Sequence, residues 1–501
     1  MTVDRRSFLA ALGGGGVAVL AGAGPAAALV DAWPGRAPAT NRMPPDWAKL
    51  RKRLGSRLVL PGDPGYAVHR LGYNELNDGH RPAAVARCAS AADVQACLDI
   101  ARGHGIPIAA RSGGHSYLGY SVPNGGLVID LRLMAHVEVG RDGIAFVGPG
   151  ARLIEVYAAL ARAGRLLPGG SCPTVGISGL TLGGGIGVLT RKYGLTCDRL
   201  AAARVVTADC SLRTASPGSE DALYWALRGG GGGNFGVVSQ FAFRTAPAPA
   251  LTVFSLSFPR GSAAEVIGAW QNWIAHAPFE LWASCQVSGG NPPTARLVGC
   301  YVGGPTAANR LLDQLVAAAR VRPSSRSVQP KTYLGAMMYM AGCSKDTVAN
   351  CHLVTEGGRL PRESFVAVSR MLGPRPLDAG RVAALMTGRT GVDLLLDALG
   401  GAVSQLAPRE TAFPHRSSLA SAQVYASATR SGQQAATRTV DAIRDGLARL
   451  GATGAYVNYI DAGLPDWGHA YYGQNLERLK QVAQHYDPDH VFAFPQSVAR
   501  A

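Results

Sequence analysis

Charged residues and long apolar runs are both scarce in this chain of 501 residues. Charged side chains make up 16% of the sequence, and the hydrophobic fraction of 47% is typical of a globular protein, not of a disordered one. No stretch approaches the ~20 consecutive apolar residues of a membrane-spanning helix, so we expect no stable membrane insertion. A chain of this length can hold two or three domains.

Acidic residues are also under-represented. The sequence has 33 Asp and Glu against 49 Lys and Arg, which gives a formal net charge of +16. This balance suits an anionic partner. The arginines are scattered, however, and no run of basic and aromatic residues forms a nucleic-acid groove. We therefore expect a solvated basic surface and no nucleic-acid partner.

The nine cysteines lack the spacing of a metal site. No two of them are separated by only two to four residues, so we predict no metal centre. Cys285 and Cys300 flank a Gly-Gly-Asn-Pro-Pro turn and could face each other across a hairpin, while Cys343 and Cys351 could close a small loop. Pairing cannot be deduced from sequence, and either bridge remains open.

The N-terminus has the pattern of an export signal. Arg5 and Arg6 precede Ser-Phe-Leu, a weakly apolar stretch covers residues 10–23, and three alanines at 26–28 offer a small-residue cleavage site. The pattern predicts a twin-arginine signal over residues 1–28 and a secreted mature protein. The alternative is an uncleaved membrane anchor, which the four glycines at 13–16 and the short apolar length argue against.

Hydrophobic periodicity predicts an α+β fold without repeating βαβ units. After a lead-in over residues 29–72, extended and Pro-rich over about 30–60, we expect a first domain over 73–250 and a second over 251–450. The first contains the strands and helices that the patterns predict at 83–87, 92–104, 106–110, 127–131, 153–163 and 200–207. The second begins with strands at 253–258 and 296–301 and a helix at 307–319, and a helix at 476–485 follows near the C-terminus.

Two glycine strings, at 183–187 and 229–233, raise the possibility of a nicotinamide site. Such a site would need an acidic residue about 20 positions later, after a strand, and neither string has one so placed. A dinucleotide fold of that type is therefore disfavoured.

Two other glycine-rich segments each carry one reactive side chain. They are residues 111–117 (Arg-Ser-Gly-Gly-His-Ser-Tyr) and 169–176 (Gly-Gly-Ser-Cys-Pro-Thr-Val-Gly). A neutral imidazole and a thiolate are both good nucleophiles, and His115 and Cys172 could each bond to an electrophilic cofactor. Glycine would let such a loop approach a phosphate or a flat ring. The alternative for either segment alone is a surface histidine and an inert cysteine.

Taken in this order, and with Phe-Pro-His-Arg at 413–416 and the C-terminal segment 486–497, the two segments resemble the berberine-bridge-enzyme-like branch of the FAD-linked oxidases, within the vanillyl-alcohol-oxidase superfamily. The resemblance implies a two-part FAD-binding domain, a substrate domain with an antiparallel sheet covered by helices, and a C-terminal segment, 451–501, that returns to the FAD domain. It also implies FAD bonded to both His115 and Cys172. The other cofactor-binding residues that it implies are Arg111, Ser112, Gly113, Gly114, Ser116, Val175, Gly176, Gly179, Val238 and Asn458.

The same resemblance assigns the catalytic groups. Tyr456, the first tyrosine of Tyr-x-Asn-Tyr, is the expected base, and Tyr117 lines the pocket and could orient the substrate or share its proton. A phenol has a pKa near ~10, so Tyr456 needs nearby positive charge or hydrogen bonds to act as a base. Gln423 stands where some relatives with another reaction have glutamate, and a side chain that cannot ionise favours alcohol oxidation over carboxylate-driven amine ring closure. For any single tyrosine the alternative is core packing.

Val175, three residues after Cys172, stands where relatives control oxygen approach, and a small side chain favours an oxidase over a dehydrogenase. Leu180 and Ile186 depart from the histidine and the aromatic residue that many relatives have. We thus expect a secreted oxidase, monomer or homodimer, that converts an alcohol or sugar hydroxyl to a carbonyl or lactone while dioxygen becomes hydrogen peroxide. Its substrate is an oligosaccharide or a glycosylated or other secondary metabolite, and the sequence does not decide between them. The alternatives are a phenol or hydroquinone oxidase that confers resistance to a redox-active compound, and an inactive flavin- or carbohydrate-binding protein.

Overall fold

The computed structural model describes residues 45–501, so the expected export signal and the start of the lead-in lie outside the described residues. The rest of the lead-in is not extended. Helix α2 (Trp47–Leu54) begins at Asp46, whose carboxylate accepts a hydrogen bond from the backbone N–H of Lys49 at 2.9 Å, and it buries Leu50 and Leu54. The prediction of an extended segment was wrong here. It gave weight to the prolines and not to Leu50 and Leu54, which stand at helical spacing. Strand β1 (Leu58–Val59) then pairs with β2, and α3 (Tyr66–His69) follows.

The first sheet has the strand order β1-β2-β4-β3 and carries the histidine segment at its end. Strands β2 (Ala84–Arg87) and β3 (Ile108–Arg111) both run parallel to β4 (Leu127–Asp130). Helix α4 (Ala91–His104) connects β2 to β3, and its buried face packs on the sheet. The predicted strands and helix are confirmed, and they form one βαβ crossover.

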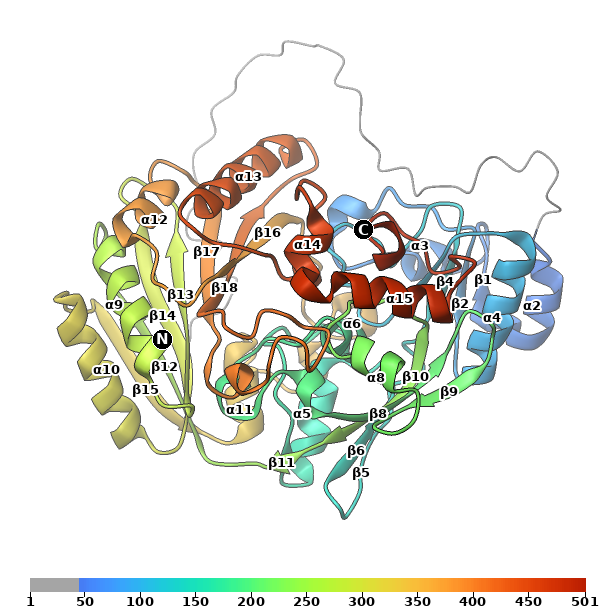
Figure 1. Ribbon diagram of the computed structural model, residues 1–501, viewed down its shortest axis with the longest axis horizontal. Coiled ribbons are helices and arrows are strands. Elements are labelled where there is room, and N and C mark those ends of the chain that lie inside the picture. The colour runs from blue at the N-terminus through green and yellow to red at the C-terminus, as the bar shows by residue number, and fades with distance from the viewer. Residues whose placement is uncertain (1–44) are drawn as a thin grey trace, which may run out of the picture.

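The second sheet is antiparallel and lies beside the first in Figure 1. Its order is β5-β6-β10-β8-β9, with β5 (Val137–Val139), β6 (Ile144–Val147), β8 (Leu200–Val206), β9 (Leu212–Ala215) and β10 (Val237–Arg244). The cysteine segment follows α5 (Leu153–Arg162) and the short strand β7 (Arg165–Leu166), which pairs with β11 (Ala246–Pro247). Three short helices belong to this part: α6 (Ile177–Leu182), α7 (Thr190–Tyr193) and α8 (Asp221–Ala226).

The third sheet has seven strands, all antiparallel, in the order β15-β12-β14-β13-β17-β18-β16. The strands are β12 (Leu251–Ser257), β13 (Leu281–Ser288), β14 (Thr294–Val302), β15 (Ser325–Lys331), β16 (Phe365–Leu372), β17 (Val392–Ala398) and β18 (Ala420–Ser427). Helices α9 (Ala263–His276), α10 (Pro305–Ala319), α12 (Ala379–Met386) and α13 (Gln433–Arg449) cover its outer face (Figure 1). The inner face turns toward the two smaller sheets, and α11 (Tyr333–Met340) packs against α5.

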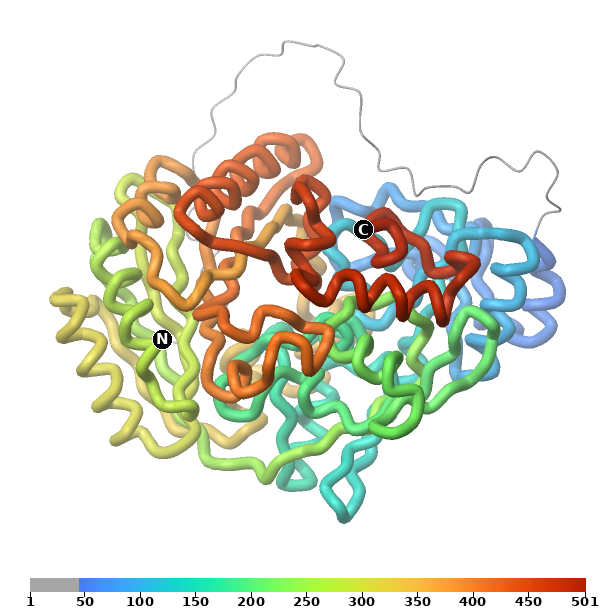
Figure 2. Tube along the Cα trace, viewed as in Figure 1, coloured from blue at the N-terminus to red at the C-terminus, as the bar shows by residue number. Residues whose placement is uncertain are grey.

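The chain ends against the first half of the molecule. After α14 (Trp467–Tyr472), helix α15 (Leu476–Tyr486) packs on α8, and the backbone N–H of Val498 donates to Asn234 Oδ1 at 2.9 Å. Figure 2 traces this red segment across the green part of the chain. None of the helices in residues 45–501 combines the length and apolar character needed to cross a bilayer.

The structure resolves the two open cysteine pairings. Cys343 and Cys351 form a disulfide. Cys285 and Cys300 do not, because the β13–β14 register places Cys285 opposite Leu297 and Cys300 opposite Trp282. Burial raises the pKa of the Cys285 thiol and of the Cys300 thiol to about 12. The turn was read correctly as a hairpin, but its register keeps these two side chains apart.

Candidate active site

A cavity of about 460 Å³ lies where the three sheets meet. Its lining includes nearly every residue that the sequence predicts for the site. These are Ser112, Gly113, Gly114, His115, Ser116, Tyr117, Cys172, Val175, Gly176, Gly179, Val238, Gln423, Tyr456 and Asn458. Leu180 and Ile186, the two positions that depart from the family pattern, line it as well. The seven-stranded sheet supplies the opposite wall.

Arg111 is the predicted site residue that does not line the cavity. Its buried guanidinium donates to Asp130 Oδ2 at 2.9 Å and to the carbonyl of Leu71 at 3.1 Å. Although burial raises the pKa of Asp130, the charges of Arg111 and Arg132 hold it well below its usual range. Arg111 therefore anchors the end of β3, from which the histidine segment leaves the sheet, and does not contact the cavity.

The glycines of the two reactive segments bring the segments together. A Cβ on Gly113 would lie 2.3 Å from the backbone nitrogen of Gly176, and a Cβ on Gly176 would lie 2.1 Å from Ser112 Oγ. Gly114 adopts a positive φ of 71°. The expected close approach to a phosphate or ring is thus, at these two glycines, a close approach of one loop to the other. Ser112 is held in the same contact, because its hydroxyl donates to the carbonyl of Pro149 at 2.6 Å.

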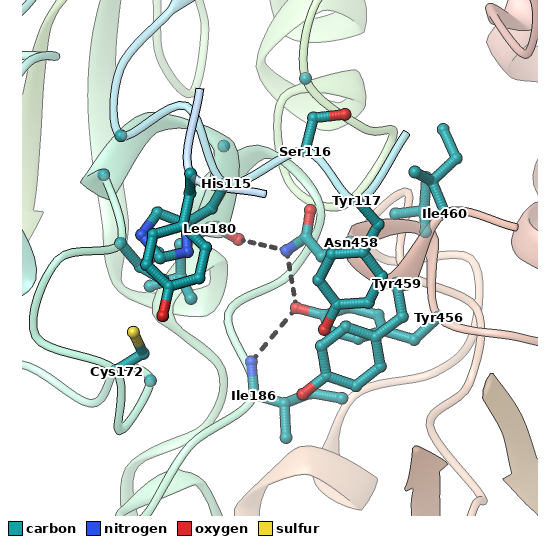
Figure 3. A pocket seen from close by; sticks show the side chains of 18 of the residues that line it. His115, Ser116, Tyr117, Cys172, Leu180, Ile186, Tyr456, Asn458, Tyr459 and Ile460 are labelled. Atoms are coloured by element: carbon teal, nitrogen blue, oxygen red, sulfur yellow. Dashed lines mark hydrogen bonds between the residues drawn. The ribbon is translucent and has the colours of Figure 1, made fainter. Parts of the chain in front are cut away.

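The loop contact places the two nucleophiles beside one hydroxyl group. Thr174 Oγ1 lies 2.9 Å from His115 Nε2 and 3.6 Å from Cys172 Sγ. The imidazole of His115 stacks on Tyr73, with ring centroids 3.8 Å apart and an interplanar angle of 17°. Figure 3 shows His115 and Cys172 on the same side of the pocket. The Thr174 hydroxyl therefore contacts both reactive groups, and the ring of Tyr73 fixes the plane of the His115 imidazole.

Tyr456 lies across the cavity and is fully buried, with 2% of its surface exposed. Its phenol oxygen accepts hydrogen bonds from the backbone N–H of Gly185 at 2.9 Å and of Ile186 at 3.3 Å. Asn458 Nδ2 donates to the same oxygen at 2.8 Å and to the carbonyl of Leu180 at 3.0 Å (Figure 3). Burial raises the pKa of Tyr456 to about 12, and these three donors oppose that shift. A phenolate can accept all three bonds and a neutral phenol only two, so the donors offset part of the effect of burial on the pKa.

Tyr117 completes an aromatic group beside Tyr456. Gln423 Nε2 donates to the phenol oxygen of Tyr117 at 2.5 Å. The ring of Tyr117 stacks on Tyr459 with centroids 5.5 Å apart, and Tyr459 meets Tyr456 edge to face at 5.0 Å. Figure 3 shows the three rings gathered on one side of the pocket. Gln423 comes from β18, so the large sheet positions a hydroxyl that belongs to the histidine segment.

Sequence reasoning missed Tyr73, Thr174 and Tyr459. Thr174 lies two residues from Cys172 and Tyr459 three residues from Tyr456, so both were within motifs that had already been singled out. Only the contacts identify them, since Thr174 bonds to a histidine 59 positions away and Tyr73 stacks on one 42 positions away in sequence.

The residues fit a covalently held flavin. His115 and Cys172 share the cavity with the phenol group, and the glycines at 231–233 and Gly179 form a wall without side chains. A Cβ on Gly179 would have no heavy atom within 4 Å, so that wall borders open space. Ser121 and Ser284 line the cavity with buried hydroxyls that have no partner among residues 45–501, which suits a bound polar molecule.

Comparisons with known families agree with this geometry. Residues 82–216 match a model described as an FAD binding domain, and residues 455–499 match one described as berberine and berberine like. The first match contains the histidine and cysteine segments, and the second contains Tyr456 and Asn458.

Relatives cover nearly the whole chain. An FAD-linked oxidoreductase of Bacillus subtilis is 33% identical over 89% of this chain and 98% of its own length. A chitooligosaccharide oxidase of Gibberella zeae is 31% identical over 83% of this chain and 87% of its own. The solved structure of BBE-like 1 from Physcomitrella patens has a TM-score of 0.84 and 30% identity, over 91% of this chain and 99% of that one. The chain therefore belongs to the berberine-bridge-enzyme-like family of FAD-linked oxidoreductases, with the α+β fold that its sequence predicts.

Proposed function

We propose that this oxidoreductase converts an alcohol or sugar hydroxyl to a carbonyl or lactone and reduces dioxygen to hydrogen peroxide. One observation carries the proposal: two phenols, of Tyr456 and Tyr117, face the same cavity as the paired nucleophiles His115 and Cys172. Oxidation of a hydroxyl requires a proton acceptor near the reacting oxygen. The similarity to a chitooligosaccharide oxidase supports a sugar as the substrate.

FAD is held by both loops in this proposal, through His115 and Cys172. When bound, the flavin ring would supply the redox chemistry, as the acceptor of a hydride from the substrate carbon and the source of electrons for dioxygen. Thr174 orients both nucleophiles, since it lies within reach of Nε2 of one and Sγ of the other. Asn458 and the glycine wall border the space that the ring system needs.

Side chains of the protein remove the proton of the substrate hydroxyl in this proposal. Tyr456 accepts the proton of the substrate hydroxyl at its phenol oxygen, where the substrate replaces the longest of three hydrogen bonds, the 3.3 Å contact from Ile186, and those from Gly185 and Asn458 remain. Tyr117 binds the same hydroxyl, with its ring fixed by Gln423 and by stacking on Tyr459. Val175 borders the cavity beside Cys172 with a small side chain, which leaves room for dioxygen.

The test is peroxide formation by the pure protein in air. We expect peroxide and reduction of the flavin with some members of a panel of oligosaccharides. Each member has either an anomeric hydroxyl at its reducing end or a primary hydroxyl. Hydroquinones and phenols belong in the same panel. Peroxide with hydroquinones alone would replace the proposal by the resistance function, and a yellow protein that none of them reduces would indicate a binding protein without catalysis.

The flavin linkage has a separate test. Denatured, acid-precipitated protein should stay yellow, and a proteolytic peptide from each loop should carry the mass of the flavin. Cys172→Ala should retain a flavin bonded through His115 alone, and His115→Ala one bonded through Cys172 alone. Release of all flavin from the wild type by acid would contradict the proposal.

We also propose export through the twin-arginine route, as the first 28 residues predict. Replacement of Arg5 and Arg6 by lysine should leave a full-length precursor in the cytoplasm, whereas the wild type should be recovered outside the membrane with an N-terminus near residue 29. Export of the double variant at the wild-type level would mean that another signal is used.

A further inference from the structure

The wall of the cavity opposite the flavin loops is one row of side chains across the large sheet. Directly paired residues of antiparallel strands point to the same face. The register pairs Arg296 with Gln286, Gln286 with Leu395, and Leu395 with Gln423, and all four side chains line the cavity. Three strand spacings separate the ends of this row, so the Cα atoms of Arg296 and Gln423 are roughly 14 Å apart.

Arg296, at the far end of the row, has no partner within the part of the chain that the structure describes. Its guanidinium has five N–H donors, yet no hydrogen bond or ion pair joins it to any of residues 45–501. The side chain is half-buried. Burial lowers its pKa, and the nearby phenol of Tyr339, which also lines the cavity, opposes that shift.

The acidic residues of the cavity do not neutralise this cation. Asp393 accepts a hydrogen bond from Ser288 Oγ at 2.6 Å, and Glu363 accepts one from the phenol of Tyr425 at 2.7 Å. Asp397, like Asp393, belongs to β17, which is separated from the strand of Arg296 by β13. The site therefore has carboxylates near its Tyr117 end and an uncompensated positive charge at the other.

A half-buried guanidinium without a counter-ion destabilises the folded protein, because desolvation is not offset by an ion pair. A carboxylate removes that cost, since its two oxygens match the planar N–H fork. The net charge of +16 also favours the approach of an anion.

We propose that the substrate is an acidic saccharide chain whose carboxylate binds Arg296 while its reacting hydroxyl lies beside Tyr117 and Tyr456. This specificity rests on the proposed function of the site. The distance along the row requires an extended molecule and not a single small alcohol. Arg296 is thus a specificity residue and takes no part in proton transfer.

The experiment compares matched acid and ester probes on the holoenzyme. Trigalacturonate and cellobiuronate are each assayed beside their methyl esters, which keep the size and lose the charge. We expect the wild type to favour the acids by about 10- to 100-fold in kcat/KM, the range of a charge-assisted hydrogen-bonded contact. Arg296→Gln should reduce the acid-to-ester ratio to about one, and Arg296→Lys should restore part of it. Arg310→Gln, an exposed arginine on α10, makes the same change of charge outside the cavity and should keep the wild-type ratio.

A binding measurement separates this inference from the proposed function. The acids, but not the esters, should raise the midpoint of thermal unfolding of the wild type, and Arg296→Gln should lose that response. If the esters are oxidised as well as the acids, the oxidase function stands and the acidic specificity is wrong. If the acids bind and are not oxidised, the oxidase function fails and the specificity stands. A changed flavin absorption spectrum in Arg296→Gln would place the guanidinium against the cofactor and overturn the proposal.

Discussion

Tyr456→Phe tests the chemistry most directly, because it removes one oxygen atom and keeps the ring. Loss of a general base typically slows a reaction by ~10²–10⁴-fold. We expect flavin reduction by substrate to slow within that range, while both flavin bonds remain. Reoxidation by dioxygen should change little, since that step does not use the proton of Tyr456 in this scheme.

Tyr456→Phe should also lower the free energy of unfolding. The phenol oxygen accepts from Gly185 and Ile186, and in the variant these two buried N–H groups lose their partner. Each buried unsatisfied donor costs about 1–3 kcal/mol. Asn458 keeps its bond to Leu180 and adds little. For the two donors this gives roughly 2–6 kcal/mol, and we expect the lower part of that range because the Ile186 contact is 3.3 Å long.

The assay is anaerobic stopped-flow reduction of the holoenzyme, followed at the flavin absorbance over a range of pH. Only the phenolate accepts a proton, and burial raises the pKa of Tyr456 to about 12. The wild-type rate should consequently rise with pH throughout the neutral and alkaline range, and the variant should lose this rise. Asn458→Leu removes one of the donors that oppose the shift, so its profile should move to higher pH.

Tyr333→Phe is the matched control. Tyr333 is buried, and its phenol donates to the carbonyl of Leu167 at 2.9 Å, but it does not line the cavity. It should lose comparable stability and keep the wild-type reduction rate. If Tyr456→Phe reduces its flavin at the wild-type rate, or if the control slows as much, the assignment of the base is wrong, and Tyr117→Phe is the next variant to measure.

Three further outcomes follow from the geometry. Thr174→Val should slow attachment of the flavin at both anchors, measured as acid-stable absorbance against time after adding FAD to apoprotein, whereas Thr174→Ser should not. Gly176→Ala should lower the urea midpoint by the equivalent of about 1–3 kcal/mol, because its Cβ would meet Ser112 Oγ at 2.1 Å; unchanged stability would contradict the loop contact. Burial lowers the pKa of His415 to about 4 from 6.5, so the unfolded chain binds a proton that the native one does not. Stability of about 3 kcal/mol should be present above pH ~6.5 and disappear as pH falls through about 4, and His415→Gln should flatten this part of the pH profile.

Local features of the fold and site could be predicted from the sequence. The helix α4 ends where Gly105 adopts a positive φ, and the strands β2, β3 and β4 follow short apolar runs, so each signal lies within a few residues of the element it describes. The cavity positions of His115 and Cys172 could be predicted for the same reason, since each is marked by its own neighbours in sequence. Arg111 belongs to the same motif as His115, yet the direction of its side chain is set by its bond to Asp130 on the neighbouring strand β4.

Features that depend on two distant segments could not be predicted. Cys285 and Cys300 were correctly placed on the two strands of a hairpin. The register pairs Cys285 with Leu297, which is three residues from Cys300, so the two cysteines do not face each other. Thr174 contacts His115 because the close approach of Gly113 and Gly176 brings its loop against the histidine segment. In each case the missing information is the relative position of two backbones, which neither segment encodes alone.

The two walls of the cavity differ in how far their residues can be predicted from local sequence. This difference bears on how substrate specificity can be inferred in this family. The wall that holds the proposed flavin anchors and base comes from compact motifs, so His115, Cys172 and Tyr456 can each be recognised from their neighbours in sequence. The recognition wall comes from one residue on each of four neighbouring strands, 296, 286, 395 and 423, which are joined only by register. A substitution at Arg296 changes no motif, and it alters the charge at the end of the row whose Cα lies roughly 14 Å from that of Gln423. Substrate class should therefore follow the residues of this row, while reaction type follows the loops.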